Sequence, residues 1–312
     1  MKIIIGYDGS ECAGDALVDL RRAGLPADTE ALVLTVADII APVAGPRTEP
    51  DLSLHGDVAL AVGRARARAG DAMAEARELA EGGASRLREL FPGWAVRAEA
   101  SADAPHWALV GSAARSGADL IVIGSHGRSA LGRVLLGSVS QQVLHHAPCS
   151  VRIARCASKA AVGVEQPVRL VLGIDGSADS ATAVSAVGSR HWPAGSEVLV
   201  VGVVDSSAVI SGLSFEPGGA GYADSSDRAA LLEGSLESAG EKIRTSGLSV
   251  TTSYSMGNAK RGLLSEAERH GADCIFVGAK GHSRLERVLL GSVSSSVAAE
   301  ARCTVEVVRT KA

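Results

Sequence analysis

The chain of 312 residues repeats itself, and this duplication restricts its possible folds more than any other feature. The octapeptide RVLLGSVS occupies positions 133–140 and again positions 287–294. Four further pairs of segments match in the same order: IGYDGS (5–10) and GIDGS (173–177), LVLTVAD (32–38) and LVVGVVD (199–205), ADLIVIGSHG (118–127) and ADCIFVGAKG (272–281), and CSVRIAR (149–155) and CTVEVVR (303–309). We therefore expect two tandem copies of one folding unit, at 1–157 and 166–312, joined by a small, polar linker.

Composition narrows the class of protein. Hydrophobic residues make up 46% of the chain and charged residues 21%, which is typical of a soluble globular protein. A net charge of −4 and only three Trp, three Tyr and three Phe argue against a nucleic-acid partner. No apolar run is long enough for a signal peptide or a membrane helix, and the five cysteines form no C-x-x-C pair. We expect a cytoplasmic protein with reduced thiols and no membrane partner.

Each half reads as strands alternating with helices. In the first half we expect strands at 2–7, 31–37, 95–100, 120–123 and 150–154, and helices at 10–24, 59–90, 105–115 and 138–146. Ser10 is suited to cap the first of these helices, and Gly117 and Gly271 to end the third helix of each half. This alternation predicts an α/β fold of two tandem doubly wound domains, each a parallel sheet with helices on both faces.

A glycine pattern follows the fourth strand of each half. Gly124 and Gly127 are followed, after nine residues, by Gly137 and Ser138. The second half repeats the spacing with Gly278, Gly281, Gly291 and Ser292. Glycines let the backbone approach a ligand closely, and the Gly-Ser pair opens a helix whose free N–H groups favour phosphate oxygens. The pattern predicts a polyphosphate-binding loop in each half, although a tight connection without a ligand would show the same glycines.

An acidic residue ends the first strand of each half. Asp8 and Asp175 stand at the carboxyl edge of the expected sheet, where doubly wound folds bind ligands. A carboxylate there can accept hydrogen bonds from ribose hydroxyls but would repel phosphate, so we assign it to the sugar; a turn-forming Asp-Gly is the alternative. The chain has neither the G-x-x-x-x-G-K-[ST] loop nor a G-x-G-x-x-G after either first strand.

Together, these motifs resemble the universal stress protein family in its tandem-domain, ATP-binding form. The resemblance covers both halves and implies five strands in the order 3-2-1-4-5 in each. It also implies ATP as the ligand, with Mg²⁺ as a candidate companion ion. The residues that it would place around the nucleotide are Gly6, Asp8, Val36, Ile123, Gly124, Ser125, His126, Gly127, Arg128, Gly137, Ser138 and Val139 in the first half, and Gly173, Asp175, Val203, Val277, Gly278, Ala279, Lys280, Gly281, His282, Gly291, Ser292 and Val293 in the second. The first half departs from the family pattern at Ala102, where the second half keeps a glycine, Gly257.

Other chemistry finds less support in the sequence. His126 is not a shared catalytic base, because the other half has Lys280 at its position. His145, His146 and Cys149 lie close in sequence, but no further ligand accompanies them, so we expect no metal site. The sequence therefore favours nucleotide binding over catalysis.

Three functions remain open at this level. The first is an ATP-binding regulatory protein of the stress response, in which nucleotide occupancy controls conformation or partner binding. The second is a slow ATPase or adenylyl-transfer enzyme, and the third is an interaction module with vestigial pockets. The segments 39–57 and 206–227 are expected to act as lids.

The last strand of each half carries alternating apolar residues: Val151 and Ile153 in the first half, Val305 and Val307 in the second. An exposed apolar edge favours strand pairing. We expect the halves to pair as an intramolecular pseudo-dimer, with a homodimer of the whole chain as a further option.

Overall fold

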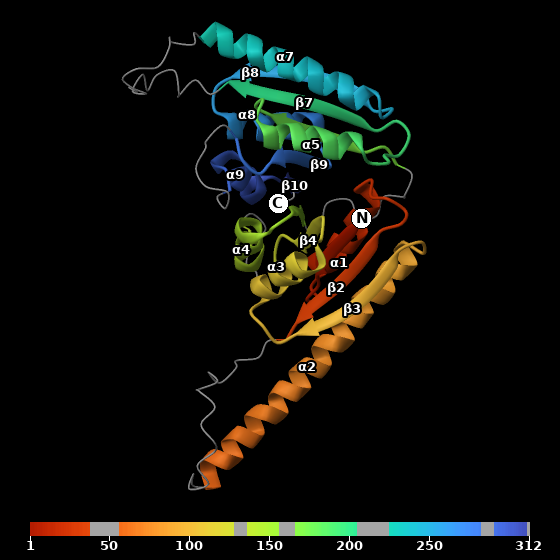
Figure 1. Ribbon diagram of the computed structural model, residues 1–312, viewed down its shortest axis with the longest axis vertical. Helices are drawn as coiled ribbons and strands as arrows, with labels where there is room; N and C mark the ends of the chain where they lie inside the picture. Colours follow the sequence, from red (N-terminus) through yellow and green to blue (C-terminus); the bar gives the residue numbers. More distant parts are fainter. Residues whose placement is uncertain (38–55, 128–135, 156–165, 205–224, 282–289, 311–312) are drawn as a thin grey trace, which may run out of the picture.

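The computed structural model describes residues 1–37, 56–127, 136–155, 166–204, 225–281 and 290–310, without the side chains of 56–62 and 225–229. The expected linker and both lid segments lie wholly or mainly outside these ranges. Strands and helices alternate in both halves, as the hydrophobic patterns predict (Figure 1).

The first half closely follows the elements expected from its sequence. Its elements are β1 (Lys2–Gly6), α1 (Glu11–Asp19), a 3₁₀ turn η1 (Leu20–Arg22), β2 (Glu30–Val36), α2 (Gly56–Leu90), β3 (Ala95–Ser101), α3 (Pro105–Ser116), β4 (Leu120–Gly124), α4 (Ser138–His146) and β5 (Ser150–Ala154). Ser10 caps α1 by accepting a hydrogen bond from the Ala13 amide at 3.2 Å. Helix α2 begins three residues earlier than expected and projects beyond the sheet (Figure 1).

The second half repeats this plan. Its elements are β6 (Arg169–Ile174), α5 (Ala178–Gly188), β7 (Glu197–Val204), α7 (Ser225–Arg244), β8 (Ser249–Met256), α8 (Ala259–His270), β9 (Cys274–Gly278), α9 (Ser292–Glu300) and β10 (Thr304–Val308). Both glycines expected to stop the third helices do so in the left-handed conformation, with φ of +63° at Gly117 and +62° at Gly271.

All strands join one ten-stranded sheet in the order β3-β2-β1-β4-β5-β10-β9-β6-β7-β8. Each half has the expected order 3-2-1-4-5 with parallel neighbours, which confirms the predicted fold class. The halves meet through β5 and β10, which pair antiparallel. The predicted pairing of the two last strands is therefore confirmed, and the chain is its own pseudo-dimer.

We call the junction where β5 pairs with β10 the seam. The two faces of the sheet differ there. On the face of α3, α4, α8 and α9, one core cluster contains residues from both halves, among them Leu109, Leu144, Leu263 and Val297. The opposite face carries two separate clusters, one under α1 and α2 and the other under α5 and α7. The hydrophobic core thus crosses between the halves on one face only.

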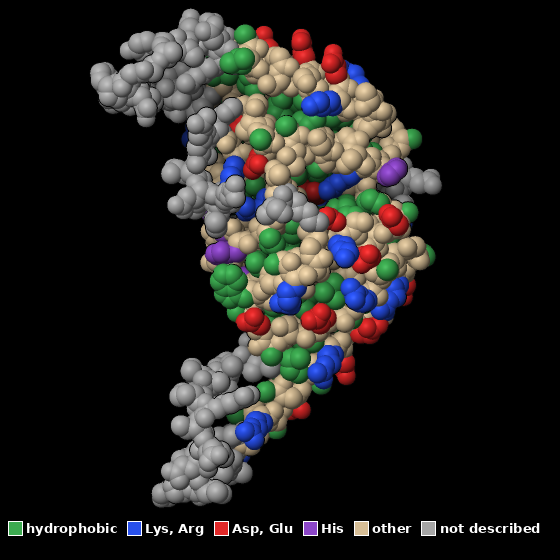
Figure 2. All heavy atoms as spheres, in the orientation of Figure 1, with side chains coloured by type: hydrophobic (Ala, Val, Ile, Leu, Met, Phe, Trp, Pro, Cys, Tyr) green, Lys and Arg blue, Asp and Glu red, His purple; other side chains and the backbone are tan. Residues whose placement is uncertain are grey.

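Two surface features bear on the sequence analysis. Among the described residues, no helix has both the length and the hydropathy needed to cross a membrane. On the face drawn in Figure 2, basic and acidic side chains are interspersed rather than collected into one basic patch.

The thiols differ from the expectation at one position. Cys12 is disulfide-bonded, whereas Cys149, Cys274 and Cys303 take part in no disulfide. The remaining cysteine, Cys156, lies outside the described residues. The expectation of reduced thiols throughout is wrong at Cys12, because spacing along the chain does not reveal which thiols the fold brings together.

Candidate functional site

The loops after the first and fourth strands lie side by side in each half. Strand β1 pairs directly with β4, and β6 pairs with β9, so the carboxyl ends of these strands share one edge of the sheet. A Cβ atom added to Gly127 would lie 2.8 Å from Asp8 Oδ2. The equivalent atom on Gly281 would lie 2.6 Å from Asp175 Oδ2. The acidic residue and the glycine loop, more than a hundred residues apart in sequence, therefore meet in both halves.

Each carboxylate is oriented by the turn that follows it. Asp8 Oδ1 accepts hydrogen bonds from the Ser10 amide at 3.0 Å and from Ser10 Oγ at 2.6 Å. Asp175 Oδ1 accepts a hydrogen bond from the Ser177 amide at 2.9 Å. Because Oδ1 is held in this way, Oδ2 of each residue is the oxygen turned toward the glycine loop. Asp8 and Asp175 therefore do stabilise the turns that follow them, and these contacts fix the direction of each carboxylate.

The two ends of the glycine loop are tied together. The Gly137 amide donates to the Ser125 carbonyl at 2.8 Å, and the Gly291 amide donates to the Ala279 carbonyl at 2.8 Å. Ser140 Oγ adds a second tie, donating to the Gly124 carbonyl at 2.8 Å. The nine-residue excursions between these ends, including Arg128 and His282, lie mainly outside the described residues. Because the Gly137 and Gly291 amides are used in these ties, neither of the two is available to a phosphate.

The helices that begin at these glycines lack a capping side chain. Gly137 and Gly291, the N-cap residues of α4 and α9, make no side-chain cap hydrogen bond. By contrast, Ser10, Ser177 and Asn258 cap α1, α5 and α8. The first residues of the uncapped helices, Ser138 and Ser292, are exposed. Val139 is half-buried and Val293 is 37% exposed. Uncapped and exposed helix starts are the kind of position that binds anions.

Several of the glycines have a packing reason of their own. A Cβ on Gly6 would lie 3.0 Å from Ile123 Cγ2, and one on Gly173 would lie 2.9 Å from Leu263 Cδ2. A Cβ on Gly124 would lie 3.0 Å from the Cys12 carbonyl oxygen, and one on Gly278 would lie 2.7 Å from the Asp179 carbonyl carbon. These four glycines let helices pack closely on the strands, whether or not a ligand is bound.

The remaining expected residues lie at the same edge of the sheet. Val36 and Val203 are half-buried at the ends of β2 and β7. The side chains of Ile123, Val277, Ser125 and Ala279 are each 1–4% exposed. These four residues are therefore buried, backbone and side chain alike.

The two halves differ in the middle of the loop. In the first half, His126 Nδ1 lies 3.0 Å from Ser125 Oγ, and the buried Nε2 has no hydrogen-bond partner. In the second half, the Lys280 amide donates to Asp179 Oδ2 at 3.0 Å. Asp179 takes the place of Cys12 in the repeat. Sequence reasoning missed Cys12 and Asp179 as neighbours of the loop, although aligning the two halves would have exposed this difference.

Groups suited to hold a metal are absent from the described ranges, where no three His, Cys, Asp or Glu side chains come together. His146 Nδ1 lies 2.8 Å from the Gln142 carbonyl within its own helix, and Cys149 is buried. Burial and the neighbouring His146 and Arg309 lower the pKa of His145.

Known proteins with the same arrangement identify the family. The model of the universal stress protein family matches residues 1–155 and again 168–309. The universal stress protein YxiE of Bacillus subtilis (strain 168) is 31% identical over 147 residues, which are 45% of this chain and 98% of that protein.

Solved structures match the whole chain. A universal stress protein from Archaeoglobus fulgidus DSM 4304 aligns over 99% of this chain and 96% of its own length, with a TM-score of 0.63 and 20% identity. A putative universal stress protein from Pseudomonas aeruginosa UCBPP-PA14 covers 99% of this chain and 92% of its own length, with a TM-score of 0.57 and 15% identity. At these identities the structures support the fold, and the family match extends over both halves: the chain belongs to the universal stress protein family.

Proposed function

We propose that each half binds ATP at the crevice between the first and fourth strands, and that nucleotide occupancy controls the conformation or partner binding of a stress-response protein. The observation that carries the proposal is the duplicated contact between Asp8 and Gly127 and between Asp175 and Gly281. In each half it brings a carboxylate suited to ribose hydroxyls next to a glycine loop that leads into an uncapped helix.

Within this proposal, different residues contact the ribose, the phosphates and the adenine. Oδ2 of Asp8 or Asp175 accepts hydrogen bonds from the ribose. The amides of Ser138 and Val139, or of Ser292 and Val293, hold the phosphates, with the serine hydroxyls as further donors. Backbone atoms of Val36 and Val203 meet the adenine edge. We place the two binding units at 1–157 and 166–312, and the protein in the cytoplasm.

The test is the nucleotide content of the purified protein. Freshly purified wild-type protein is denatured, and the released nucleotides are identified by chromatography. We expect ATP from the wild type and at least tenfold less from the double variant Gly127→Glu/Gly281→Glu, because each substitution adds a bulky carboxylate against Asp8 or Asp175 in the proposed crevice. Gly70→Glu is the matched control, since a Cβ at Gly70 has nothing within 4 Å. Unchanged ATP content in the double variant would refute the loop assignment.

Catalytic alternatives are tested with the same preparations. A regulatory binding role predicts that added ATP stays intact, with or without Mg²⁺. Steady release of AMP and pyrophosphate would indicate adenylyl transfer, and release of ADP and phosphate would indicate an ATPase. Either release would have to disappear in the Gly127→Glu/Gly281→Glu variant to be assigned to these sites.

A further inference from the structure

The seam between the halves has an arginine and a glutamate at its centre. In the β5–β10 ladder, Arg152 is the direct partner of Glu306. The two residues also occupy the same position of the repeat, within CSVRIAR and CTVEVVR. The pseudo-twofold axis that relates the halves therefore passes through this pair. The duplicated position has opposite charges in the two copies, whereas both of its neighbours are aliphatic.

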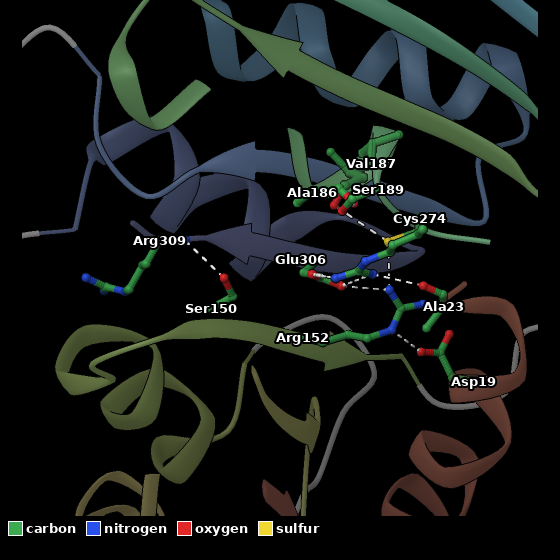
Figure 3. Close-up of polar contacts among 12 residues, drawn as sticks. Asp19, Ala23, Ser150, Arg152, Ala186, Val187, Ser189, Cys274, Glu306 and Arg309 are labelled. Atoms are coloured by element: carbon green, nitrogen blue, oxygen red, sulfur yellow. Dashed lines mark hydrogen bonds and ion pairs between the residues drawn. The ribbon is translucent and has the colours of Figure 1, made fainter. Parts of the chain in front are cut away.

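The pair is fully buried and part of a chain of charges (Figure 3). Arg152 Nη1 lies 3.1 Å from Glu306 Oε2, and Arg152 Nε lies 2.7 Å from Asp19 Oδ2. Arg190 forms an ion pair with the other oxygen of Glu306. Arg152 is 1% exposed and Glu306 is 0% exposed. Burial opposes both charges, but Asp19 and Glu306 raise the pKa of Arg152, and the two arginines lower the pKa of Glu306.

Each central charge is supported from its own half. Asp19, at the end of α1, orients Arg152, and Arg190, just after α5, orients Glu306. The repeat has no copy of either support, because Ala186 stands at the position of Asp19 and Ala23 at that of Arg190. Thus the first half presents an oriented guanidinium at its edge, and the second half presents an oriented carboxylate.

On the face of α4 and α9, the described contacts of the seam do not distinguish the two halves. Arg155 donates to the Ala298 and Ala299 carbonyls in the last turn of α9. Its repeat equivalent, Arg309, donates to the Leu144 carbonyl in the last turn of α4 at 2.7 Å. These reciprocal contacts and the apolar cluster on the same face would fit two like halves as well as two unlike ones. The preference for pairing a first half with a second half, rather than with a copy of itself, therefore depends on the face that carries Arg152 and Glu306.

A pair of like halves would lack the central contact. Two first halves would bring two guanidinium groups together at the axis, with no Glu306 to accept from their Nη atoms. Two second halves would bring two carboxylates together. Buried donors without acceptors and like charges at an interface both oppose association, whereas the apolar neighbours alone would allow it.

We propose that Arg152 and Glu306 form a pairing code, in which the β5 edge of the first half accepts a β10 edge with a central glutamate and rejects a second copy of itself. The code acts before the chain is complete. The first half is synthesised and folds first, which leaves its β5 edge exposed while the second half is still being made. An inward-pointing charge on an exposed edge strand protects it from pairing with its own kind. The preferred partner is the second half of the same chain.

The test uses full-length chains with altered codes. One variant reverses the first half with Asp19→Ala/Arg152→Glu, and the other reverses the second half with Arg190→Ala/Glu306→Arg. The alanines are the residues that the opposite half already has at these positions. Each variant alone has like charges at its seam, but together they offer two complementary seams. Each is unfolded in denaturant and refolded alone or mixed with the other, and one of the two carries an affinity tag.

We expect a reciprocal complex only in the mixture, with the tagged chain retaining the untagged chain in equal amount. Tagged and untagged wild type refolded together should show at least tenfold less retention, because the linker favours pairing within one chain at an effective concentration of about 1 mM. The chain with all four substitutions has a reversed but complementary code, and we expect it to refold as a single compact chain. If this chain fails to pair its halves, or if the complementary mixture retains no more than the wild type, the proposal is overturned. The outcome does not depend on nucleotide binding.

Discussion

At the scale of residues, the candidate sites depend on where one carboxylate oxygen points. Ser10 holds Asp8 Oδ1, and the turn thereby directs Oδ2 to the glycine loop. The same turn in the second half directs Asp175 Oδ2 to Gly281. The absence of a side chain at Gly127 and Gly281 is therefore needed for the position of each carboxylate.

This geometry predicts the effect of one methyl group. In Gly127→Ala the new Cβ would stand 2.8 Å from Asp8 Oδ2, so the carboxylate or the loop must move. We expect ATP affinity of the first half to fall about tenfold, which corresponds to about 1.4 kcal/mol. Calorimetric titration of Gly127→Ala in a Gly281→Glu background measures this site alone, with Gly70→Ala in the same background as the control. Equal affinities for the two would contradict the proposed role of Asp8.

The Glu306 carboxylate predicts a dependence of stability on pH. Its pKa in the folded protein lies below the ordinary value of 4.5, so its contribution to stability is fully present above pH 4.5. As the pH falls below 4.5, the unfolded chain takes up the proton first, and the contribution is lost until the folded pKa is reached. We expect a slope of up to about 1.4 kcal/mol per pH unit from this group. Urea unfolding at several acidic pH values should show a smaller slope in Glu306→Gln; an identical slope would contradict this assignment.

At the scale of elements, the described helix starts differ in whether a side chain caps them. Ser10, Ser177 and Asn258 cap the starts of α1, α5 and α8 with side-chain oxygens. Helices α4 and α9 begin at glycines without such a cap, and both of those starts adjoin the candidate sites. Helix α3 also starts without a side-chain cap, at Ala104, so α4 and α9 are distinguished by their position beside the glycine loops rather than by the missing cap alone.

The helix stop at Gly117 can be tested separately from packing. Its φ is +63°, and an added Cβ would have nothing within 4 Å, so Gly117→Ala acts through backbone conformation alone. We expect the free energy of unfolding to fall by about 1–2 kcal/mol. Gly82→Ala in α2 is the matched control, since Gly82 also has open space but lies inside a helix; it should gain up to about 1 kcal/mol. Denaturant unfolding measures both, and changes of the same sign would contradict the explanation.

At the scale of the whole molecule, two kinds of contact hold the halves together. Arg155 and Arg309 reach across the seam to the last turns of α9 and α4. On the opposite face, Arg22 pairs with Asp273 at 2.5 Å, and the His191 amide donates to the Gly24 carbonyl at 3.0 Å. The reciprocal arginine contacts follow the pseudo-twofold symmetry, and the charge chain around Arg152 breaks it.

Symmetry predicts that the two arginines contribute similarly. Arg155→Ala and Arg309→Ala each remove a part-buried hydrogen bond from a charged donor to helix carbonyls, so we expect each to destabilise the protein by about 1–3 kcal/mol. Arg302→Ala is the control, because Arg302 is 86% exposed in its pair with Glu268, and it should change stability by less than about 0.5 kcal/mol. Thermal unfolding compares the three. A loss confined to either Arg155 or Arg309, both half-buried, would show that the seam is not symmetric on this face.

Sequence and tertiary structure determined different parts of this protein. Local patterns were enough for the elements, for the stops at Gly117 and Gly271, and for the strand order, once the family resemblance was noted. The repeat and strand order also brought Asp8 to the glycine loop, and apolar alternation predicted the pairing of β5 with β10. The elements and helix stops depend on neighbours in sequence, whereas the strand order was available only through the family resemblance.

Only the tertiary structure revealed the disulfide at Cys12, the contact of Asp179 with the Lys280 amide, and the buried chain of Asp19, Arg152, Glu306 and Arg190. Arginine and glutamate in the last strands would ordinarily be assigned to solvent. They are buried because β5 and β10, nearly half the chain apart in sequence, pair at their centres. The sequence around either residue does not reveal a contact of that range.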